Sequence, residues 1–188
     1  MSAGRPRSGG VTETATAPVS PPGQDEWQRF EALYRSSRDD LYGYVATLLR
    51  DPAAAEDVTE LAFERAYRRR RTFDRRRGEE RAWLFGIARN AALDELRRRS
   101  RLAALTADPE DAAGERPDDG AEVALRRTAV RAALSELAPR DREIVALKFH
   151  AGLSNGELAK VLGVSESNAG TMLHRAIEKL RKACNETA

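Results

Sequence analysis

The sequence predicts an all-α protein made of two small helical domains that a flexible acidic linker joins. Only 6% of its 188 residues are aromatic and 33% are charged, a composition typical of a soluble helical protein. Apolar residues recur every three or four positions through most of the chain after residue 25, which indicates amphipathic helices. Seven acidic residues accompany Pro and Gly between two such regions, at 101–122. The length allows two small domains, each with a modest core.

The first domain is expected over residues 25–100. The segment before it, 1–24, is rich in Gly, Pro, Ser and Thr and predicts a disordered tail. Apolar stripes at 27–34, 41–49, 58–67 and 83–99 predict four helices. Asp51-Pro52 separates the second from the third, because Pro is well tolerated in the first turn of a helix.

The helix expected at 83–99 has two different faces. Phe85, Ala88, Ala92 and Leu96 share one side and predict a core contact. The opposite side carries Asn90, Asp94, Arg97, Arg98 and Arg101. Guanidinium and amide groups suit phosphates and base edges, so this face is a candidate for nucleic-acid binding. An ordinary amphipathic helix with a solvated Arg-rich face explains the pattern equally well.

The second domain, expected over 123–183, contains a predicted helix-turn-helix. Ser154 and Glu157 are spaced as a capping box, and Gly163 suits the turn after the short helix that they open. Ser165 then begins a longer helix. The polar face of this last helix starts with Ser167, Asn168 and Thr171, the candidate base-reading residues, and continues with Arg175, a candidate phosphate contact. A plain corner between two helices of a bundle is the alternative.

Three long motifs, together with the linker, resemble the extracytoplasmic-function (ECF) sigma factors of bacteria, a family of RNA polymerase sigma factors. The motifs are AEDVTELAFERAY (55–67), AWLFGIARNAALDELRRR (82–99), and LSELAPRDREIVALKFHAGLSNGELAKVLGVS followed by LHRAIEKLR (134–181). The resemblance implies an alternative sigma factor that binds core RNA polymerase and promoter DNA under the control of an anti-sigma factor. The sequence departs from the usual family pattern at two places. Glu60 and Leu61 replace the usual Gln and Glu, and Gly170 and Met172 stand where basic residues are common.

The resemblance also assigns roles to individual residues. Asp57, Glu60 and Arg65 are expected to dock on the polymerase. Arg89, Asn90, Asp94, Arg97 and Arg98 are expected to read the minus-ten promoter element and separate its strands, with the loop 74–81 as one wall. Ser167, Asn168, Thr171, His174 and Arg175 are expected to read the minus-thirty-five element.

Other functions find little support in the sequence. His150 and His174 have no Cys or carboxylate at metal-ligand spacing, so we expect no enzyme, no metal and no cofactor. The single Cys184 and the lack of a long apolar segment favour a cytoplasmic protein that is not inserted in a membrane. A free-standing helix-turn-helix regulator that acts without polymerase remains the alternative function.

Overall fold

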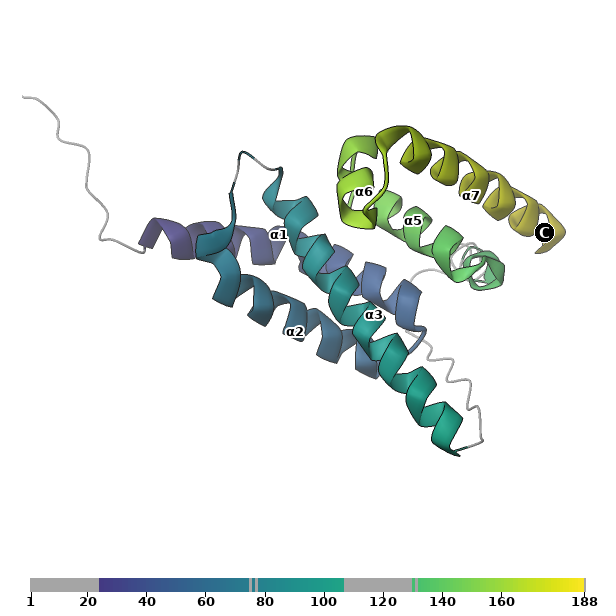
Figure 1. The fold of residues 1–188 in the computed structure, drawn as a ribbon, viewed down its shortest axis with the longest axis horizontal. Coiled ribbons are helices and arrows are strands. Elements are labelled where there is room, and N and C mark those ends of the chain that lie inside the picture. Colours follow the sequence, from purple (N-terminus) through teal and green to yellow (C-terminus); the bar gives the residue numbers. More distant parts are fainter. Residues whose placement is uncertain (1–23, 75, 77, 107–129, 131, 188) are drawn as a thin grey trace, which may run out of the picture.

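The computed structural model describes residues 24–74, 76, 78–106, 130 and 132–187 of the chain, and within them it is helical, with no strand. This confirms the predicted all-α class. The elements are α1 (Gln24–Leu49), α2 (Pro52–Arg69), a 3-10 turn η1 (Arg70–Thr72), α3 (Glu80–Thr106), α5 (Pro139–Phe149), α6 (Asn155–Leu162) and α7 (Glu166–Thr187) (Figure 1). Residues 132–136 are also helical.

Helices α1, α2 and α3 pack against one another as a three-helix bundle. The prediction of four helices in this part was wrong, because the first two apolar stripes belong to the single helix α1. Leu33 and Leu41 are eight residues apart, and the buried hydroxyl residue Ser37 lies midway between them. One helical face therefore runs without a break through the polar stretch between the stripes.

Helix α2 begins where the sequence predicts, and α3 ends later. The Asp51 carboxylate accepts a hydrogen bond from the backbone N–H of Ala54 at 3.1 Å and so caps α2, with Pro52 in its first turn. Helix α3 continues through Thr106, six residues beyond the expected end of the first domain. Good helix formers occupy 101–105, and no stop signal occurs before Pro109. The expected tail before Gln24 and the expected linker after Thr106 lie outside the described residues.

Helices α5, α6 and α7 form the predicted helix-turn-helix arrangement. The Ser154 hydroxyl accepts from the backbone N–H of Glu157, and the Glu157 carboxylate accepts from the backbone N–H of Ser154 at 2.8 Å, which confirms the capping box. Gly163 adopts the left-handed conformation at φ 70° and ends α6. The Ser165 hydroxyl accepts from the N–H of Asn168 at the start of α7. Phe149 at the end of α5 is a large apolar residue that the pattern of the segment places with Ile144, Val145 and Leu147, but it is 68% exposed.

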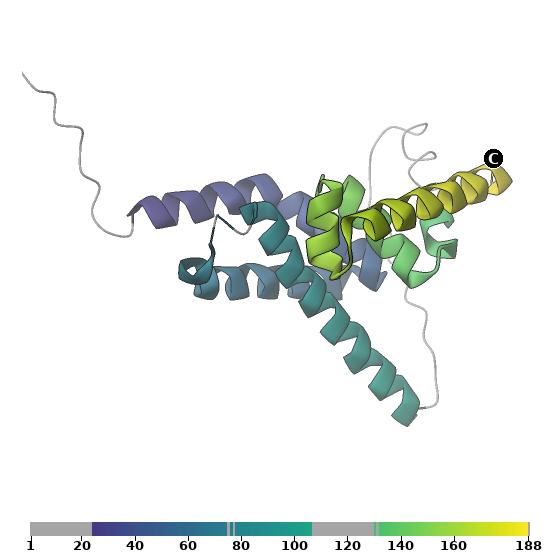
Figure 2. The same ribbon diagram turned by 45° about the horizontal axis from the view of Figure 1, so that its top comes forward.

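The two groups of helices share one continuous hydrophobic core. Helix α5 packs on α1 and α6 packs on α3, and Figures 1 and 2 show α6 beside the first half of α3. The buried members of this core come from both groups, among them Tyr44, Phe85, Ile144 and Leu147. The chain is therefore folded back on itself, so that the C-terminal helices cover part of the helix expected to read the minus-ten element.

Replacing Ser154 with Ala should lower the free energy of unfolding by about 1 kcal/mol, because the first turn of α6 loses its cap. Thermal or urea unfolding of the full chain measures this change. Ser100→Ala is the matched control. Ser100 is exposed inside α3, where Ala is the better helix former, so the control should not destabilise the chain. Equal destabilisation by both variants would contradict the cap.

Candidate nucleic-acid interface

The second half of α3 presents a polar face to solvent. Asn90, Asp94, Arg97 and Arg98 are exposed, whereas Phe85, Ala88 and Ala92 on the opposite side are fully buried. This distribution confirms the two faces predicted for the helix. The guanidinium of Arg97 donates to the Asp94 carboxylate at 3.1 Å, and Arg65 of α2 lies 3.9 Å from the same carboxylate.

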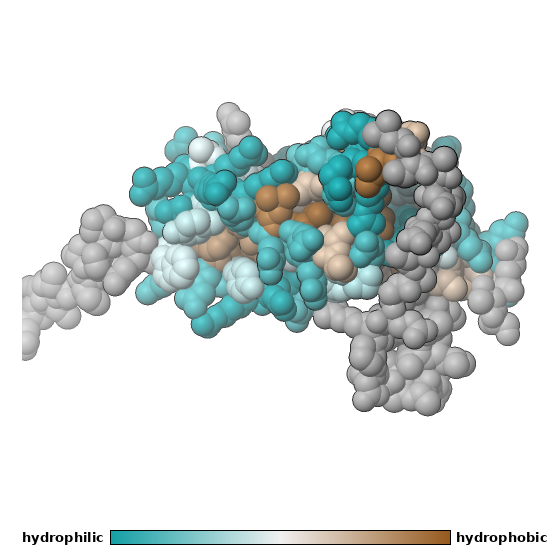
Figure 3. Space-filling model, turned by 90° about the horizontal axis from the view of Figure 1, so that it is seen from below, coloured by the Kyte–Doolittle hydropathy of each residue, from teal (hydrophilic) through white to brown (hydrophobic). Residues whose placement is uncertain are grey.

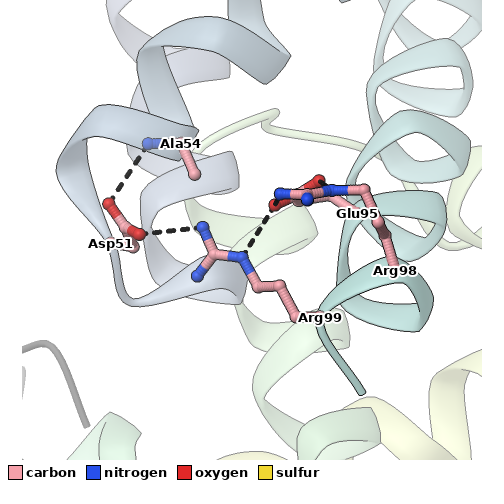
Figure 4. A network of polar contacts seen from close by, with 5 residues as sticks. All are labelled: Asp51, Ala54, Glu95, Arg98 and Arg99. Carbon is pink, nitrogen blue, oxygen red and sulfur yellow. Dashed lines mark hydrogen bonds and ion pairs between the residues drawn. The ribbon is translucent and has the colours of Figure 1, made fainter. Parts of the chain in front are cut away.

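A network of ion pairs anchors this face to the start of α2 (Figure 4). Arg99 donates to Asp51 at 2.8 Å and to Glu95 at 2.8 Å, so it joins the cap of α2 to α3. Arg98 approaches Glu95 with both arms of its fork, at 2.7 and 2.8 Å. These hydrogen bonds from Arg98 and Arg99 lower the pKa of Glu95 to about 2. The backbone N–H of Ala54 and the Arg99 guanidinium lower the pKa of Asp51 as well.

The network places the neighbouring residues Arg98 and Arg99 in different environments. The Arg99 guanidinium is committed to two carboxylates and is two-thirds buried, so its contribution is structural. The Arg98 side chain is 62% exposed and is held by one carboxylate, which fixes its direction and leaves it open to solvent. A side chain that is already oriented loses less entropy when it binds a ligand.

A shallow groove separates α2 from α3 beside this network. Its walls carry Val58 and Leu61 from α2, with Glu95 and Arg98 from α3. Figure 3 shows hydrophobic side chains gathered near the middle of the molecular face that α2 and α3 form, with hydrophilic side chains around them. Of the expected docking residues, Asp57 lines the groove and Glu60 is exposed on α2. Arg65 also lines it and is half-buried beside Asp94.

Helix α7 presents its expected reading face to solvent. Ser167, Asn168, Thr171, His174 and Arg175 are all exposed, and the helix packs through Ala169, Leu173 and Ala176. Met172 is half-buried against the core. The missing cation at this position is therefore replaced by a packing contact.

The first half of α3 has a different environment, and there the structure brings together residues that the sequence did not connect. Arg89 donates through Nε to Glu143 Oε1 of α5 at 2.7 Å. Arg81 hydrogen-bonds α1 and the C-terminal end of α5 at the same time, with its Nε 2.8 Å from the carbonyl oxygen of Ala151 and its Nη2 2.6 Å from Asp40 Oδ2. A cation at this position also complements the negative end of the α5 dipole.

The same boundary buries two ionisable side chains whose pKa values shift. Burial lowers the pKa of His150, whose ring lies against Gly43 of α1, and the nearby Asp40 opposes that shift. Burial and the charge of Glu143 raise the pKa of Tyr44 well above its usual value. The Tyr44 hydroxyl has no hydrogen-bond partner within the part of the chain that the structure describes.

Comparison with known proteins identifies the family. Residues 33–102 match Sigma-70 region 2, and residues 127–180 match Sigma-70 region 4. The chain is 31% identical to the ECF RNA polymerase sigma factor SigL of Mycobacterium tuberculosis over 156 residues, which are 82% of this chain and 88% of SigL. The chain belongs to the ECF RNA polymerase sigma factors. It is also 34% identical over 166 residues to the ECF sigma factor BldN of Streptomyces coelicolor, covering 87% of this chain but only 63% of BldN.

The fold of this sigma factor is found in a solved structure as well. In the co-crystal structure of the sigma factor RpoE with the anti-sigma factor NepR from Bartonella quintana, the similar chain gives a TM-score of 0.73 at 21% identity. The match covers 86% of this chain and 98% of that one. None of the helices in the described ranges is both long enough and apolar enough to cross a membrane.

Sequence reasoning missed Arg81, Glu143 and His150 as functional candidates in this sigma factor. Arg81 is the second residue of α3, and nothing nearby in the sequence identifies its partners, which are 41 to 70 residues away. Glu143 could have been found from the sequence, because a charged residue within an apolar helical segment requires a partner when it is buried. Of the expected wall at 74–81, Arg75 and Arg77 lie outside the described residues.

Replacing Glu95 with Gln should lower the free energy of unfolding at pH 7 by about 1–3 kcal/mol, because two guanidinium groups lose a partly buried carboxylate. Glu64→Gln is the matched control, since Glu64 pairs with Arg68 on the exposed surface of α2, and its loss should cost less than about 0.5 kcal/mol. Urea unfolding of both variants and of the parent chain gives these values.

The stabilisation that the Glu95 carboxylate provides should decrease as the pH falls. The pKa in the folded chain, about 2, lies below the ordinary value of 4.5, so the carboxylate stabilises the fold above pH 4.5 and that contribution is lost as the pH falls towards 2. The difference between the parent chain and Glu95→Gln should shrink over this interval. A difference that stays constant down to pH 2 would contradict the ion-pair network.

Proposed function

We propose that this sigma factor binds core RNA polymerase and directs initiation at promoters with two recognition elements. The observation that carries the proposal is the presence of two separate exposed polar faces, on α3 and on α7, within one chain of this family. A simple duplex-binding regulator needs only the second face. The first face supports a role at opened DNA, as the family resemblance implies.

Asn90, Asp94, Arg97 and Arg98 are the proposed minus-ten residues on α3. Capture of single-stranded bases needs polar side chains held at fixed positions and cations along the backbone. The Glu95–Arg98 fork and the Asp94–Arg97 pair hold both arginines on one side of the helix. Arg89 belongs to the same proposed set, and it is paired with Glu143 instead of facing solvent.

Ser167, Asn168, Thr171, His174 and Arg175 are the proposed minus-thirty-five residues. The first turns of the second helix of a helix-turn-helix enter the major groove, and these side chains occupy that part of α7. Arg175 supplies a positive charge for a phosphate near the base readers. Because Met172 packs inward, we expect few phosphate contacts from this helix and a weak salt dependence of its binding to duplex DNA.

The proposed docking surface for the polymerase is the exposed side of α2 with Asp57, Glu60 and Arg65. Leu61, where the family usually carries Glu, lines the groove between α2 and α3, and so adds an apolar contact to this surface. We further propose that an anti-sigma factor controls the chain, by analogy with RpoE of Bartonella quintana and its partner NepR. We also propose that the protein is not an enzyme and that it acts in the cytoplasm.

Run-off transcription with core RNA polymerase tests the proposal. The double variant Arg97→Ala/Arg98→Ala should reduce open-complex formation roughly a hundredfold, because two charge-assisted contacts of about 1.5 kcal/mol each are lost. Arg35→Ala/Arg38→Ala removes two exposed, paired arginines from α1 and is the matched control, with activity near that of the parent chain.

Two results would overturn the proposal. One is a failure of core polymerase to start RNA synthesis with this chain at any promoter selected from genomic fragments. The other is tight, sequence-specific binding of intact duplex by the chain alone, with no change caused by Arg97→Ala/Arg98→Ala. That second result would favour the free-standing regulator.

A further inference from the structure

Five aromatic side chains gather where the first turns of α1 meet the last turns of α2. We call them the aromatic surface: Trp27, Phe30, Tyr34, Phe63 and Tyr67. Trp27 is 54% exposed, Tyr34 40% and Tyr67 36%, so the described helices leave much of this surface open to solvent. Figures 1 and 2 show that this end of the bundle lies far from α7. A cluster of exposed aromatic side chains indicates a binding surface.

Specific contacts hold the aromatic surface in shape. The rings of Trp27 and Tyr67 meet edge to face, with their centroids 5.9 Å apart and their planes at 87°. The Arg70 guanidinium lies over the Tyr67 ring, 4.0 Å from its centroid. The Glu26 carboxylate lies 3.9 Å from Arg70 and 3.6 Å from Arg71, which ties the first turn of α1 to η1. A ligand that binds here therefore has little side-chain motion to arrest.

The same contacts favour an uncharged, apolar ligand over a nucleic acid. Binding of single strands needs open ring faces for the bases and cations for the backbone. Arg70 covers one face of Tyr67 and is itself paired with Glu26. The aromatic surface thus offers ring edges beside a charge that the chain already compensates.

The sequence directly before α1 supplies a ligand of this kind. Residues 14–24 read TATAPVSPPGQ and carry no charge. Pro18 and Pro21 are spaced as P-x-x-P, the pattern of segments that adopt a polyproline II helix and bind aromatic-lined surfaces. Helix α1 begins at Gln24, so this segment ends within one helical turn of Trp27.

The spacing of the prolines matches the spacing of the aromatic side chains. Three residues make one turn of a polyproline II helix, so Pro18 and Pro21 would lie on the same side of it, about 9 Å apart. Trp27 and Tyr34 are seven residues apart on one face of α1, about 10 Å along its axis. A reversal of the chain at Gly23, which glycine permits, would bring Pro21 to Trp27 and Pro18 to Tyr34.

The covalent connection makes even a weak contact sufficient. A segment joined to its binding surface by a few residues has an effective concentration on the order of millimolar. Two proline rings on an aromatic surface therefore need only a dissociation constant in that range to be bound for much of the time. The polyproline II conformation also costs little entropy on binding, because it is already present in the free segment.

We infer that the aromatic surface is a proline-rich peptide site that the chain fills with its own residues 18–21. The segment lies along the first turns of α1 as a polyproline II turn, with Pro21 against Trp27 and Pro18 against Tyr34. The inference is independent of the proposed function, because it uses no contact with DNA or polymerase.

Fluorescence quenching in the full chain tests this inference. Trp83→Phe leaves Trp27 as the only tryptophan, so its quenching by acrylamide reports its exposure. Pro18→Ser/Pro21→Ser in this background should raise the quenching constant roughly twofold, because docking shields one of the two faces of the indole ring. Pro6→Ser is the control within the same N-terminal segment and should leave the constant unchanged.

A peptide added in trans tests the same site without the tether. The synthetic peptide APVSPPG, at millimolar concentration, should restore the low quenching constant to Pro18→Ser/Pro21→Ser. The peptide ASVSSPG, which lacks the two spaced prolines, is its control and should not.

A spin label locates the segment directly. Ala17→Cys in a Cys184→Ser background carries the label, and Ser2→Cys is the control position. The label at 17 should broaden the backbone amide resonances of residues 30–36 and the indole resonance of Trp27 more than the label at 2 does. Pro18→Ser/Pro21→Ser should remove the difference between the two labels.

Several results would overturn the inference. One is a quenching constant that the proline substitutions leave unchanged, or that Pro6→Ser raises equally. Another is equal broadening by the labels at 17 and 2. Broadening in a mixture of isotope-labelled chain and separate spin-labelled chain would assign the surface to a second copy. Protection of Trp27 by a 20-nucleotide single-stranded DNA, equal in the parent and in Pro18→Ser/Pro21→Ser, would assign it to nucleic acid.

Discussion

The guanidinium group of Arg81 is the contact on which the arrangement of the helices depends most. It donates five hydrogen bonds, to the Ser36 carbonyl, the Ser37 hydroxyl and the Asp40 carboxylate of α1, and to the carbonyls of His150 and Ala151 after α5. Ser37 and Ala151, which carry two of these acceptors, are buried, and a buried group without its partner costs about 1–3 kcal/mol. Arg81, at the start of α3, thus links α3 to α1 and to the end of α5.

The packing that Arg81 secures also includes contacts that cost free energy. The buried Tyr44 hydroxyl lacks a partner among the described residues, which opposes the gain from the apolar contacts around it. Glu143 is buried at this boundary, where its ion pair with Arg89 has to offset the desolvation of both groups. The proposed DNA-contacting face of α7 is exposed, whereas Arg89 of the proposed face on α3 is paired with Glu143.

The sequence predicted what is encoded locally. Helix class, the helix boundary at Asp51-Pro52, the caps at Ser154 and Ser165, the left-handed Gly163 and the two faces of α3 all follow from residues close together in the sequence. The capping role of the Asp51 side chain came from the structure. The roles assigned to individual site residues remain predictions, although the structure places most of them on exposed faces. Continuity of α1 was missed because the polar stretch at 35–40 looked like a break, whereas the buried Ser37 carries the helical face through it.

Contacts between segments that are distant in the sequence could not be predicted. The partners of Arg81 and Arg89 lie 41 to 70 residues away, and no periodic pattern pairs them. The acidic residues at 101–122 suggested two separate domains, and nothing local indicates that their surfaces fit together. Glu143 stood within an apolar segment and was not counted as a signal, although burial of a lone carboxylate requires a cation.

Assembly with core RNA polymerase should separate the C-terminal helices from α3. Energy transfer between dyes at positions 79 and 155, recorded before and after core polymerase is added to the labelled chain, measures this directly. The transfer should fall on binding and stay low through open-complex formation. Unchanged transfer in a complex that makes RNA would contradict the account, because the covered half of α3 would then have no part in initiation.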